Sequence, residues 1–249
     1  MKLIQNVHVF APKDIGIQDI LIGEGKILNI GKNIKCGNLD VETIDGSSLI
    51  ATPGFIDGHV HITGGGGEAG YQSRINPISK ADLLAGGVTT VLGLLGTDGY
   101  TRSMKDLIAK AKGLKAEGIS TYLFTGSYQI PVRTLFSTIE DDMLFTTEII
   151  GTGEIAIADH RSSQVTVNDL RDVIAKTHVA GLLSNKAGVT VIHLGKEPNG
   201  IKMIIDALDN TGIPIEKVLP THANRNQAIL DDAINYHHSH GLYFDITAT

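Results

Sequence analysis

Histidines follow several apolar runs of the sequence, at positions where they could bind a metal ion. His59 and His61 come at the end of the apolar run 55–62. Side chains two residues apart on a strand point to the same face, so these two imidazoles can bind one ion. His193 and His222 end two later apolar runs. Any one of them also fits a hydrogen-bonded structural histidine, but four at strand ends favour a site for zinc or another first-row metal.

A run of four glycines, Gly64 to Gly67, follows the histidine pair and leads directly into Glu68. Glycines let a backbone approach a ligand closely and expose its amide donors, and the Glu68 carboxylate can bind an ammonium group. Arg161 and Arg225 follow later apolar runs, and a guanidinium pairs with a carboxylate through two hydrogen bonds. A flexible glycine loop, an exposed glutamate and two weak surface ion pairs are the simpler interpretation of the same residues.

The composition limits both the metal ligands and the partners. The 249 residues include one cysteine, Cys36, which excludes an internal disulfide and a thiolate cluster, so any metal ion must be bound by histidine and carboxylate. A net charge of −6 without a basic patch argues against nucleic-acid binding. No stretch approaches the ~18 consecutive apolar residues of a membrane span, and the N-terminus lacks the apolar core of a signal peptide. We therefore expect a cytoplasmic protein that binds neither nucleic acid nor membrane.

The first 52 residues differ in pattern from the rest of the chain. Runs rich in Ile, Val and Leu at 3–10, 19–31 and 41–50 are broken by glycine-containing turns, which predicts short β-strands. Three short strands cannot bury two faces by themselves. We therefore predict a small β-sandwich domain at 1–52, present only in its N-terminal part, and a second domain at 53–249.

Apolar, β-branched runs alternate with helical patterns over the second domain. The expected strands are 55–62, 88–94, 120–125, 154–158, 189–194, 218–221 and 242–246, and the expected helices are 79–85, 103–117, 167–178, 200–211 and 228–238. Ser103 and Asn168 are of residue types that cap helix N-termini. Repeated βα units of this length predict a parallel sheet.

Two α/β folds fit this alternation, a doubly wound sheet and a (β/α)8 barrel. No Gly-x-Gly-x-x-Gly motif opens a helix after the first strand, which weakens the dinucleotide-binding alternative. Polar residues instead follow the C-terminal ends of many strands, where barrel enzymes have their active sites. We therefore predict an α/β protein with a TIM-like (β/α)8 barrel, of which seven of the eight strands are present, after the small N-terminal β domain.

Six segments carry a resemblance to a known family: 59–70 (HVHITGGGGEAG), 93–98 (GLLGTD), 125–128 (TGSY), 159–162 (DHRS), 191–195 (VIHLG) and 219–226 (LPTHANRN). Together they resemble the metal-dependent amidohydrolase superfamily and, within it, the isoaspartyl dipeptidases. The resemblance runs from the N-terminus to Thr249, and the four glycines followed by glutamate are its most specific part. It implies a TIM-barrel metallopeptidase that acts on small β-aspartyl dipeptides and assembles as a homo-oligomer.

The resemblance also implies a set of metal ligands. His59 and His61 would bind one of two divalent ions, and His193 and His222 the other. In the relatives a carboxylated lysine on the fourth strand bridges the ions, and Glu154 stands at that position here. Glutamate likewise offers two oxygens and one negative charge, so we expect Glu154 to bridge two zinc ions. A single ion is the alternative, and manganese, cobalt or iron also suit these ligands.

The resemblance assigns roles toward the substrate as well. Glu68 would hold the α-ammonium group, while Arg161 and Arg225 would bind the two carboxylates of a β-aspartyl dipeptide. Tyr128 would polarise the scissile carbonyl and stabilise the oxyanion, although ordinary packing of a buried tyrosine fits the sequence too. Further substrate contacts are expected at Gly66 and Thr97. The implied reaction is amide hydrolysis by a hydroxide that bridges the metal ions.

One catalytic group of the family has no counterpart in the sequence. The relatives carry a proton-accepting aspartate on the eighth strand, whereas this sequence ends at Thr249 and Asp245 belongs to the predicted seventh strand. We therefore expect a truncated sequence. Two other functions stay open. One is another amidohydrolase, such as a cyclic-amide hydrolase or a deacetylase, that does not need Glu68 and the arginines; the other is a non-catalytic remnant that binds metal.

Overall fold

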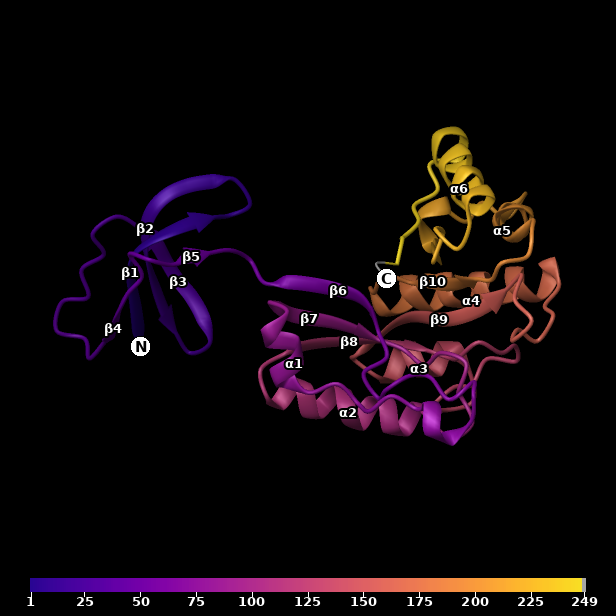
Figure 1. The fold of residues 1–249 in the computed structure, drawn as a ribbon, viewed down its shortest axis with the longest axis horizontal. Helices are drawn as coiled ribbons and strands as arrows, with labels where there is room; N and C mark the ends of the chain where they lie inside the picture. The colour runs from indigo at the N-terminus through magenta and orange to yellow at the C-terminus, as the bar shows by residue number, and fades with distance from the viewer. Residues whose placement is uncertain (248–249) are drawn as a thin grey trace. The chain divides into compact units, whose positions relative to one another are not determined.

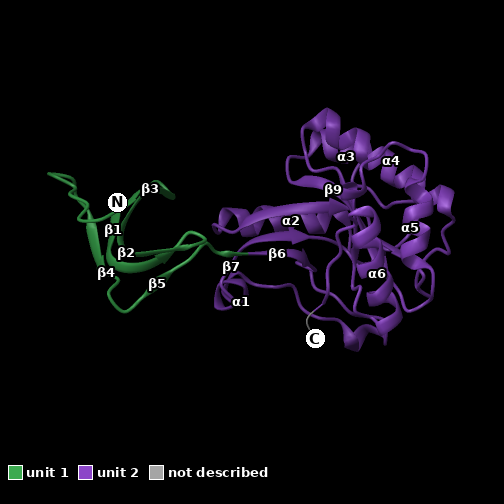
Figure 2. Cartoon of the chain, turned by 90° about the horizontal axis from the view of Figure 1, so that it is seen from above, with its two compact units in different colours: residues 1–55 green, residues 56–249 purple. Residues whose placement is uncertain are grey.

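A computed structural model describes residues 1–247 of the chain. The chain forms two compact units, Met1–Phe55 and Ile56–Thr249 (Figure 2). Each unit has its own sheet and its own apolar core. Among the described residues, no helix combines the length and the apolar character needed to cross a membrane.

The first unit is a five-stranded sheet. Its strands are β1 (Lys2–Phe10), β2 (Asp14–Gly23), β3 (Lys26–Gly31), β4 (Glu42–Asp45) and β5 (Ile50–Ala51). They are ordered β3-β2-β1-β4, with β5 also paired to β1, and Val7, Val9 and Ile20 form the core. The predicted run 19–31 is divided between two strands, because Glu24 and Gly25 take left-handed backbone conformations and reverse the chain.

The second unit is built on a parallel six-stranded sheet that curls into half a barrel (Figure 1). Its strands are β6 (Phe55–Val60), β7 (Val88–Gly93), β8 (Ser120–Thr125), β9 (Ile149–Ile157), β10 (Val189–Leu194) and β11 (Val218–Thr221). They lie in the order β11-β10-β9-β8-β7-β6, so that strands consecutive in the sequence are neighbours in the sheet. The prediction of a parallel, barrel-type α/β fold with a separate N-terminal sheet is therefore confirmed.

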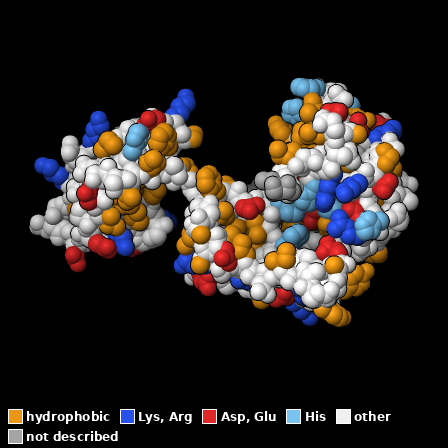
Figure 3. All heavy atoms as spheres, viewed as in Figure 1, with side chains coloured by type: hydrophobic (Ala, Val, Ile, Leu, Met, Phe, Trp, Pro, Cys, Tyr) orange, Lys and Arg blue, Asp and Glu red, His pale blue; other side chains and the backbone are white. Residues whose placement is uncertain are grey.

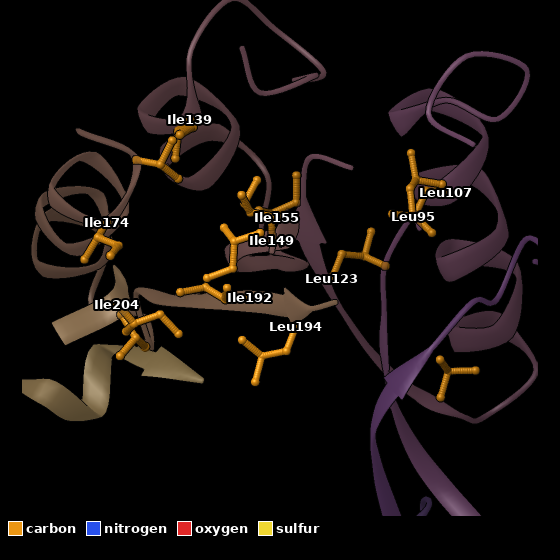
Figure 4. Packing of buried hydrophobic residues seen from close by; sticks show 14 of the residues in the cluster. Leu95, Leu107, Leu123, Ile139, Ile149, Ile155, Ile174, Ile192, Leu194 and Ile204 are labelled. Carbon is orange, nitrogen blue, oxygen red and sulfur yellow. The ribbon is translucent and has the colours of Figure 1, made fainter. Parts of the chain in front are cut away.

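Helices cover this sheet and close the core. They are α1 (Lys80–Ala85), α2 (Met104–Ala116), α3 (Ile139–Phe145), α4 (Val167–Ser184), α5 (Gly200–Leu208) and α6 (Gln227–His240), with 3₁₀ turns at Tyr71–Ser73 and Ile215–Lys217. Figure 4 shows strand residues such as Ile155 and Ile192 meeting helix residues such as Ile174 and Ile204 in one apolar cluster. Burial of these side chains holds the strands, and therefore the residues at their ends, in fixed register.

The segment predicted as a seventh strand does not form one. Residues 242–246 run beside β11, where the Asp245 amide donates to the Pro220 carbonyl and the Ala223 amide donates to the Asp245 carbonyl, both at 3.1 Å. Pro220 has no N–H to donate, so a continuous ladder cannot form across this part of β11. The described part of the sheet therefore has six strands rather than seven.

Candidate active site

The C-terminal ends of four strands bring five expected metal ligands together. His59 is the penultimate residue of β6 and His61 follows that strand; Glu154 lies on β9, His193 on β10, and His222 directly after β11. Because the strands are parallel, all four ends open on the same edge of the sheet. We call these five residues the metal cluster.

Glu154 lies at the centre of the cluster and presents a different oxygen to each histidine pair. Its Oε2 atom is 3.4 Å from His59 Nε2 and 4.0 Å from His61 Nε2. Its Oε1 atom is 2.5 Å from His193 Nδ1 and 3.0 Å from His222 Nε2. One carboxylate therefore serves two separate groups of nitrogen ligands, which is the arrangement that a bridging ligand requires.

The unpaired atoms of the cluster fit metal ions. In the part of the chain that the structure describes, His59 Nδ1, His59 Nε2 and Glu154 Oε2 are buried without a hydrogen-bond partner. Buried polar atoms are otherwise almost always satisfied. The ligand atoms of the groups His59–His61–Glu154 and Glu154–His193–His222 each lie within 4.8 Å of one another. Four imidazoles and a carboxylate are ligands that zinc and other first-row metals accept.

The electrostatics of the cluster keep its carboxylate ionised. Burial by itself would raise the pKa of Glu154, but the hydrogen bonds from His193 and His222 and the nearby His59 imidazole hold it well below its usual value. Burial favours the neutral form of His59 and His61, the two histidines at the end of β6. It lowers the pKa of His61, whereas the Glu154 charge outweighs it and raises the pKa of His59. The cluster thus supplies one fixed negative charge among four imidazoles.

Tyr128 reaches the cluster from the loop that follows β8. Its side chain is buried, and its hydroxyl lies 2.8 Å from His193 Nδ1. Burial and the nearby Glu154 charge raise the pKa of the Tyr128 phenol, so it stays protonated and able to donate a hydrogen bond. Tyr128 therefore lies beside the metal cluster, where it was expected, and its neutral hydroxyl can donate a hydrogen bond.

The expected substrate residues gather in loops beside the cluster. The Glu68 carboxylate accepts hydrogen bonds from Thr97 Oγ1 at 3.0 Å and from Arg161 Nη1 at 3.2 Å. Its own backbone amide, and then Thr97 and Arg161, outweigh burial and lower the pKa of Glu68, so it is ionised. We call Gly64–Glu68, Thr97 and Arg161 the substrate arm.

Asp159 belongs to the segment 159–162 that carries the resemblance, but no role in the site was predicted for it from the sequence. Arg161 donates to it in bidentate fashion, from Nε at 2.9 Å and from Nη2 at 2.7 Å. Asp159 Oδ2 also lies 3.1 Å from His193 Nε2, and the Nη2 atoms of Arg161 and Arg225 lie 3.1 and 3.3 Å from the same nitrogen. The two arginines expected to bind carboxylates therefore converge on one point. Its position directly after the predicted strand 154–158 could have indicated a site residue.

Two adjoining cavities connect the arm to the cluster. A cavity of about 40 Å³ is lined by His61, Tyr128 and Glu68, and a larger one of about 390 Å³ is lined by Glu68, Arg161 and Tyr100. Gly66 and Thr97 line both. Figure 3 shows histidines gathered with basic and acidic side chains in a hollow of the second unit. The smaller cavity therefore borders the metal cluster at His61, and the larger cavity lies over the substrate arm.

The barrel-type sheet and the metal cluster are features of a known protein family. Residues 50–248 match the model of the amidohydrolase family. The chain belongs to this family, whose members are typically dependent on divalent metals.

Within the family, the structure is similar to that of a β-aspartyl dipeptidase from Fervidobacterium islandicum AW-1. It matches the complex of that enzyme with β-Asp-Leu dipeptide at a TM-score of 0.92 and 41% identity, over 99% of this chain and 65% of the other. A second structure of the dipeptidase from that organism matches at a TM-score of 0.94 and 40% identity, over 100% and 68%. The predicted resemblance and the TIM-barrel fold class are thereby confirmed.

The sequence is also similar to that of an enzyme with another activity in its name. A dihydroorotase from Geobacter metallireducens is 39% identical over 131 residues, which is 50% of this chain and 29% of the relative. The chain thus spans about two thirds of the length of the dipeptidase structures and less than a third of this dihydroorotase. Both comparisons agree on an amidohydrolase.

Proposed function

We propose that this protein hydrolyses β-aspartyl dipeptides in a metal-dependent reaction. The single observation that carries the proposal is the juxtaposition of two features. Glu154 turns one oxygen to each histidine pair, and the ionised Glu68 lies across a small cavity from that cluster. The similar structure with bound β-Asp-Leu supports the choice of substrate.

The metal cluster would hold two divalent ions, and we propose zinc. His59 and His61 would bind one ion, His193 and His222 the other, and Glu154 both. Ions bound there lower the pKa of water and polarise a carbonyl group. The buried, unpaired atoms of His59 and Glu154 support this assignment independently of the family.

The remaining residues orient the substrate. Glu68 would bind the α-ammonium group, and the guanidinium groups of Arg161 and Arg225, which converge beside His193, would bind carboxylates. With both ends fixed, the β-carbonyl rather than an α-carbonyl faces the cluster. Gly66 and Thr97 line the cavity where the substrate backbone would lie.

Tyr128 would act on the scissile carbonyl. Its protonated hydroxyl lies within the cluster, where it can donate a hydrogen bond to the oxygen that becomes negative during attack. A donor fixed before the reaction stabilises that charge without reorganising, which typically accelerates hydrolysis by about 10²–10³-fold.

The test is a comparison of three substrates with the metal-loaded protein. We expect kcat/KM for β-Asp-Leu to exceed that for α-Asp-Leu by at least about 10²-fold, because only the β-linked isomer would place its charges on Glu68, Arg161 and Arg225 with the scissile carbonyl at the cluster. Dihydroorotate should not be hydrolysed. Equal rates on the two dipeptides would refute the proposed specificity.

A second candidate is a cyclic-amide hydrolase, which the sequence match to a dihydroorotase favours. Such an enzyme needs the metal cluster but has no ammonium group for Glu68 to bind. Turnover of dihydroorotate without turnover of β-Asp-Leu would establish this alternative in place of the first.

A further inference from the structure

A buried arginine, Arg102, packs against the glycine loop at the wall of the small cavity that His61 and Tyr128 also line. Arg102 lies between β7 and α2, and its side chain is 5% exposed. It belongs neither to the metal cluster nor to the groups assigned above to the substrate. A fully ionised group is costly to bury unless it is paired, so its partners define its role.

The Arg102 guanidinium donates to backbone carbonyls on both sides of the loop. Its Nη2 atom donates to Gly65 O at 2.9 Å and to Ile75 O at 3.3 Å. Nε donates to Thr63 O at 3.2 Å, and Nη1 lies 3.5 Å from Gly66 O. Three of these four carbonyls, those of Thr63, Gly65 and Gly66, belong to the segment that leads into Glu68.

The glycines make this arrangement possible. Gly64 and Gly66 have left-handed φ values of 85° and 65°. A Cβ atom at Gly64 would lie 2.0 Å from Ile75 O, and one at Gly66 would lie 2.5 Å from Ser73 O. The loop is thus pressed against the 73–75 backbone, with its carbonyls directed toward Arg102, and is not a freely flexible linker.

Asp98 connects Arg102 to the segment that contains Thr97, the residue that hydrogen-bonds Glu68. It accepts from Arg102 Nη1 at 3.1 Å and from the amides of Tyr100 and Thr101. Its neighbour in the chain, Thr97, donates directly to the Glu68 carboxylate. The Arg102–Asp98 pair therefore braces both segments that determine where Glu68 lies.

We propose that Arg102 is a positioning residue for recognition of the substrate α-ammonium group, acting through the glycine loop on Glu68. The inference rests on the proposed function, because it needs Glu68 to bind that ammonium group. Lysine at this position would keep the charge beside Asp98, but its three donors cannot reproduce the planar fork across four carbonyls. The loop would then lose its fixed position while the metal cluster is left intact.

The experiment compares Arg102→Lys with a matched control, Arg171→Lys. Arg171 also binds backbone carbonyls, those of Ala207 at 3.0 Å and Asp206 at 2.8 Å, but it does so between α4 and α5. The two substrates are β-Asp-Leu and succinyl-Leu, which has the same scissile bond and lacks only the α-amine. We expect Arg102→Lys to raise KM for β-Asp-Leu about tenfold with little change in kcat, and to leave KM for succinyl-Leu unchanged.

A second readout does not depend on turnover. Hydrogen exchange of the amides at 64–68 should be faster in Arg102→Lys than in wild type and unchanged in Arg171→Lys. If Arg102→Lys does not fold, Asp98→Asn keeps the guanidinium, removes its charge partner and should change both readouts in the same direction. Equal KM changes for both substrates, or unchanged exchange at 64–68, would overturn the inference. Failure of wild type to hydrolyse β-Asp-Leu would instead refute the proposed function, and the exchange experiment would still test the anchor.

Discussion

The metal cluster and the substrate arm are neighbours in the second unit, yet they are built in different ways. The cluster comes from the ends of four strands, and its central Glu154 is completely buried. The arm comes from loops, and the Glu68 side chain is 41% exposed. The strand ends are fixed by the core of the sheet, whereas the arm is held by hydrogen bonds from arginines. We infer that reactivity resides in the cluster, which the sheet fixes, and selectivity in the arm, which hydrogen bonds fix.

Removal of the Glu154 carboxylate, which we propose bridges the metal ions, should have the largest effect. Glu154→Gln keeps the shape of the side chain but removes its charge and one strong ligand atom. We expect loss of bound metal, measured by elemental analysis, and a fall in kcat of about 10³-fold, which corresponds to about 4 kcal/mol. A control is Glu148→Gln, which changes another largely buried glutamate, paired with Lys115 at 3.5 Å. Full metal content in Glu154→Gln would contradict the bridging role.

Tyr128→Phe should have the next largest effect and separates chemistry from metal binding. Loss of the hydroxyl removes the donor that we propose acts on the reacting oxygen, so kcat should fall by about 10²-fold or more. Metal content and KM should change little. A variant with unchanged kcat and a raised KM would place Tyr128 in the arm rather than with the cluster.

Arg161→Lys tests the residue that joins the two regions. Arg161 contacts Glu68 on one side and Asp159 and His193 on the other. Lysine cannot keep the bidentate pair with Asp159, so we expect kcat/KM to fall by about 10–10²-fold, mainly through KM. A fall confined to kcat with unchanged KM would show that Arg161 acts on the cluster alone.

The smallest expected effect is on stability in acid. Burial would raise the pKa of Asp98, but hydrogen bonds from Thr101 and Tyr100 and the charge of Arg102 lower it. A carboxylate with a lowered pKa in the folded state contributes stability above its unfolded pKa of about 3.9, and that stability is lost as the pH falls toward the folded value. Asp98→Asn should therefore lower Tm by a few degrees at pH 7, and the difference from wild type should shrink below about pH 4. A difference that stays constant with pH would contradict this assignment.

The bounds of β8, β10 and β11 could be predicted from the sequence to the residue, because each is a short run of mainly apolar and β-branched residues. The start of β9 was predicted five residues late, because Gly151 and Gly153 interrupt the β pattern. Both glycines are required by packing, since a Cβ at Gly151 would lie 2.2 Å from Val189 O. Helix α3 was missed altogether, because three consecutive acidic residues, 140–142, separate its apolar residues and leave no clear period.

Helix caps and arginine roles also show which features of single residues the sequence could and could not predict. Ser103 caps α2 as predicted, but α4 is capped by Thr166 and not by Asn168, because Thr166 and Asp169 form a reciprocal capping box. The histidines of the cluster stand at the ends of apolar runs, a pattern that is local in sequence, whereas Glu154 was assigned through the resemblance alone. The roles of Arg102 and Asp159 depend on contacts between distant loops, and no local pattern distinguishes a buried arginine from an exposed one.

The most direct test of the division between cluster and arm is the effect of Glu68→Gln on two substrates that share one scissile bond. We predict that this variant lowers kcat/KM for β-Asp-Leu by about 10–10²-fold, because a charge-assisted contact with the ammonium group is lost. The same variant should leave kcat/KM for succinyl-Leu and the metal content unchanged. Equal losses on both substrates would show that Glu68 belongs to the bond-breaking machinery and would contradict the account.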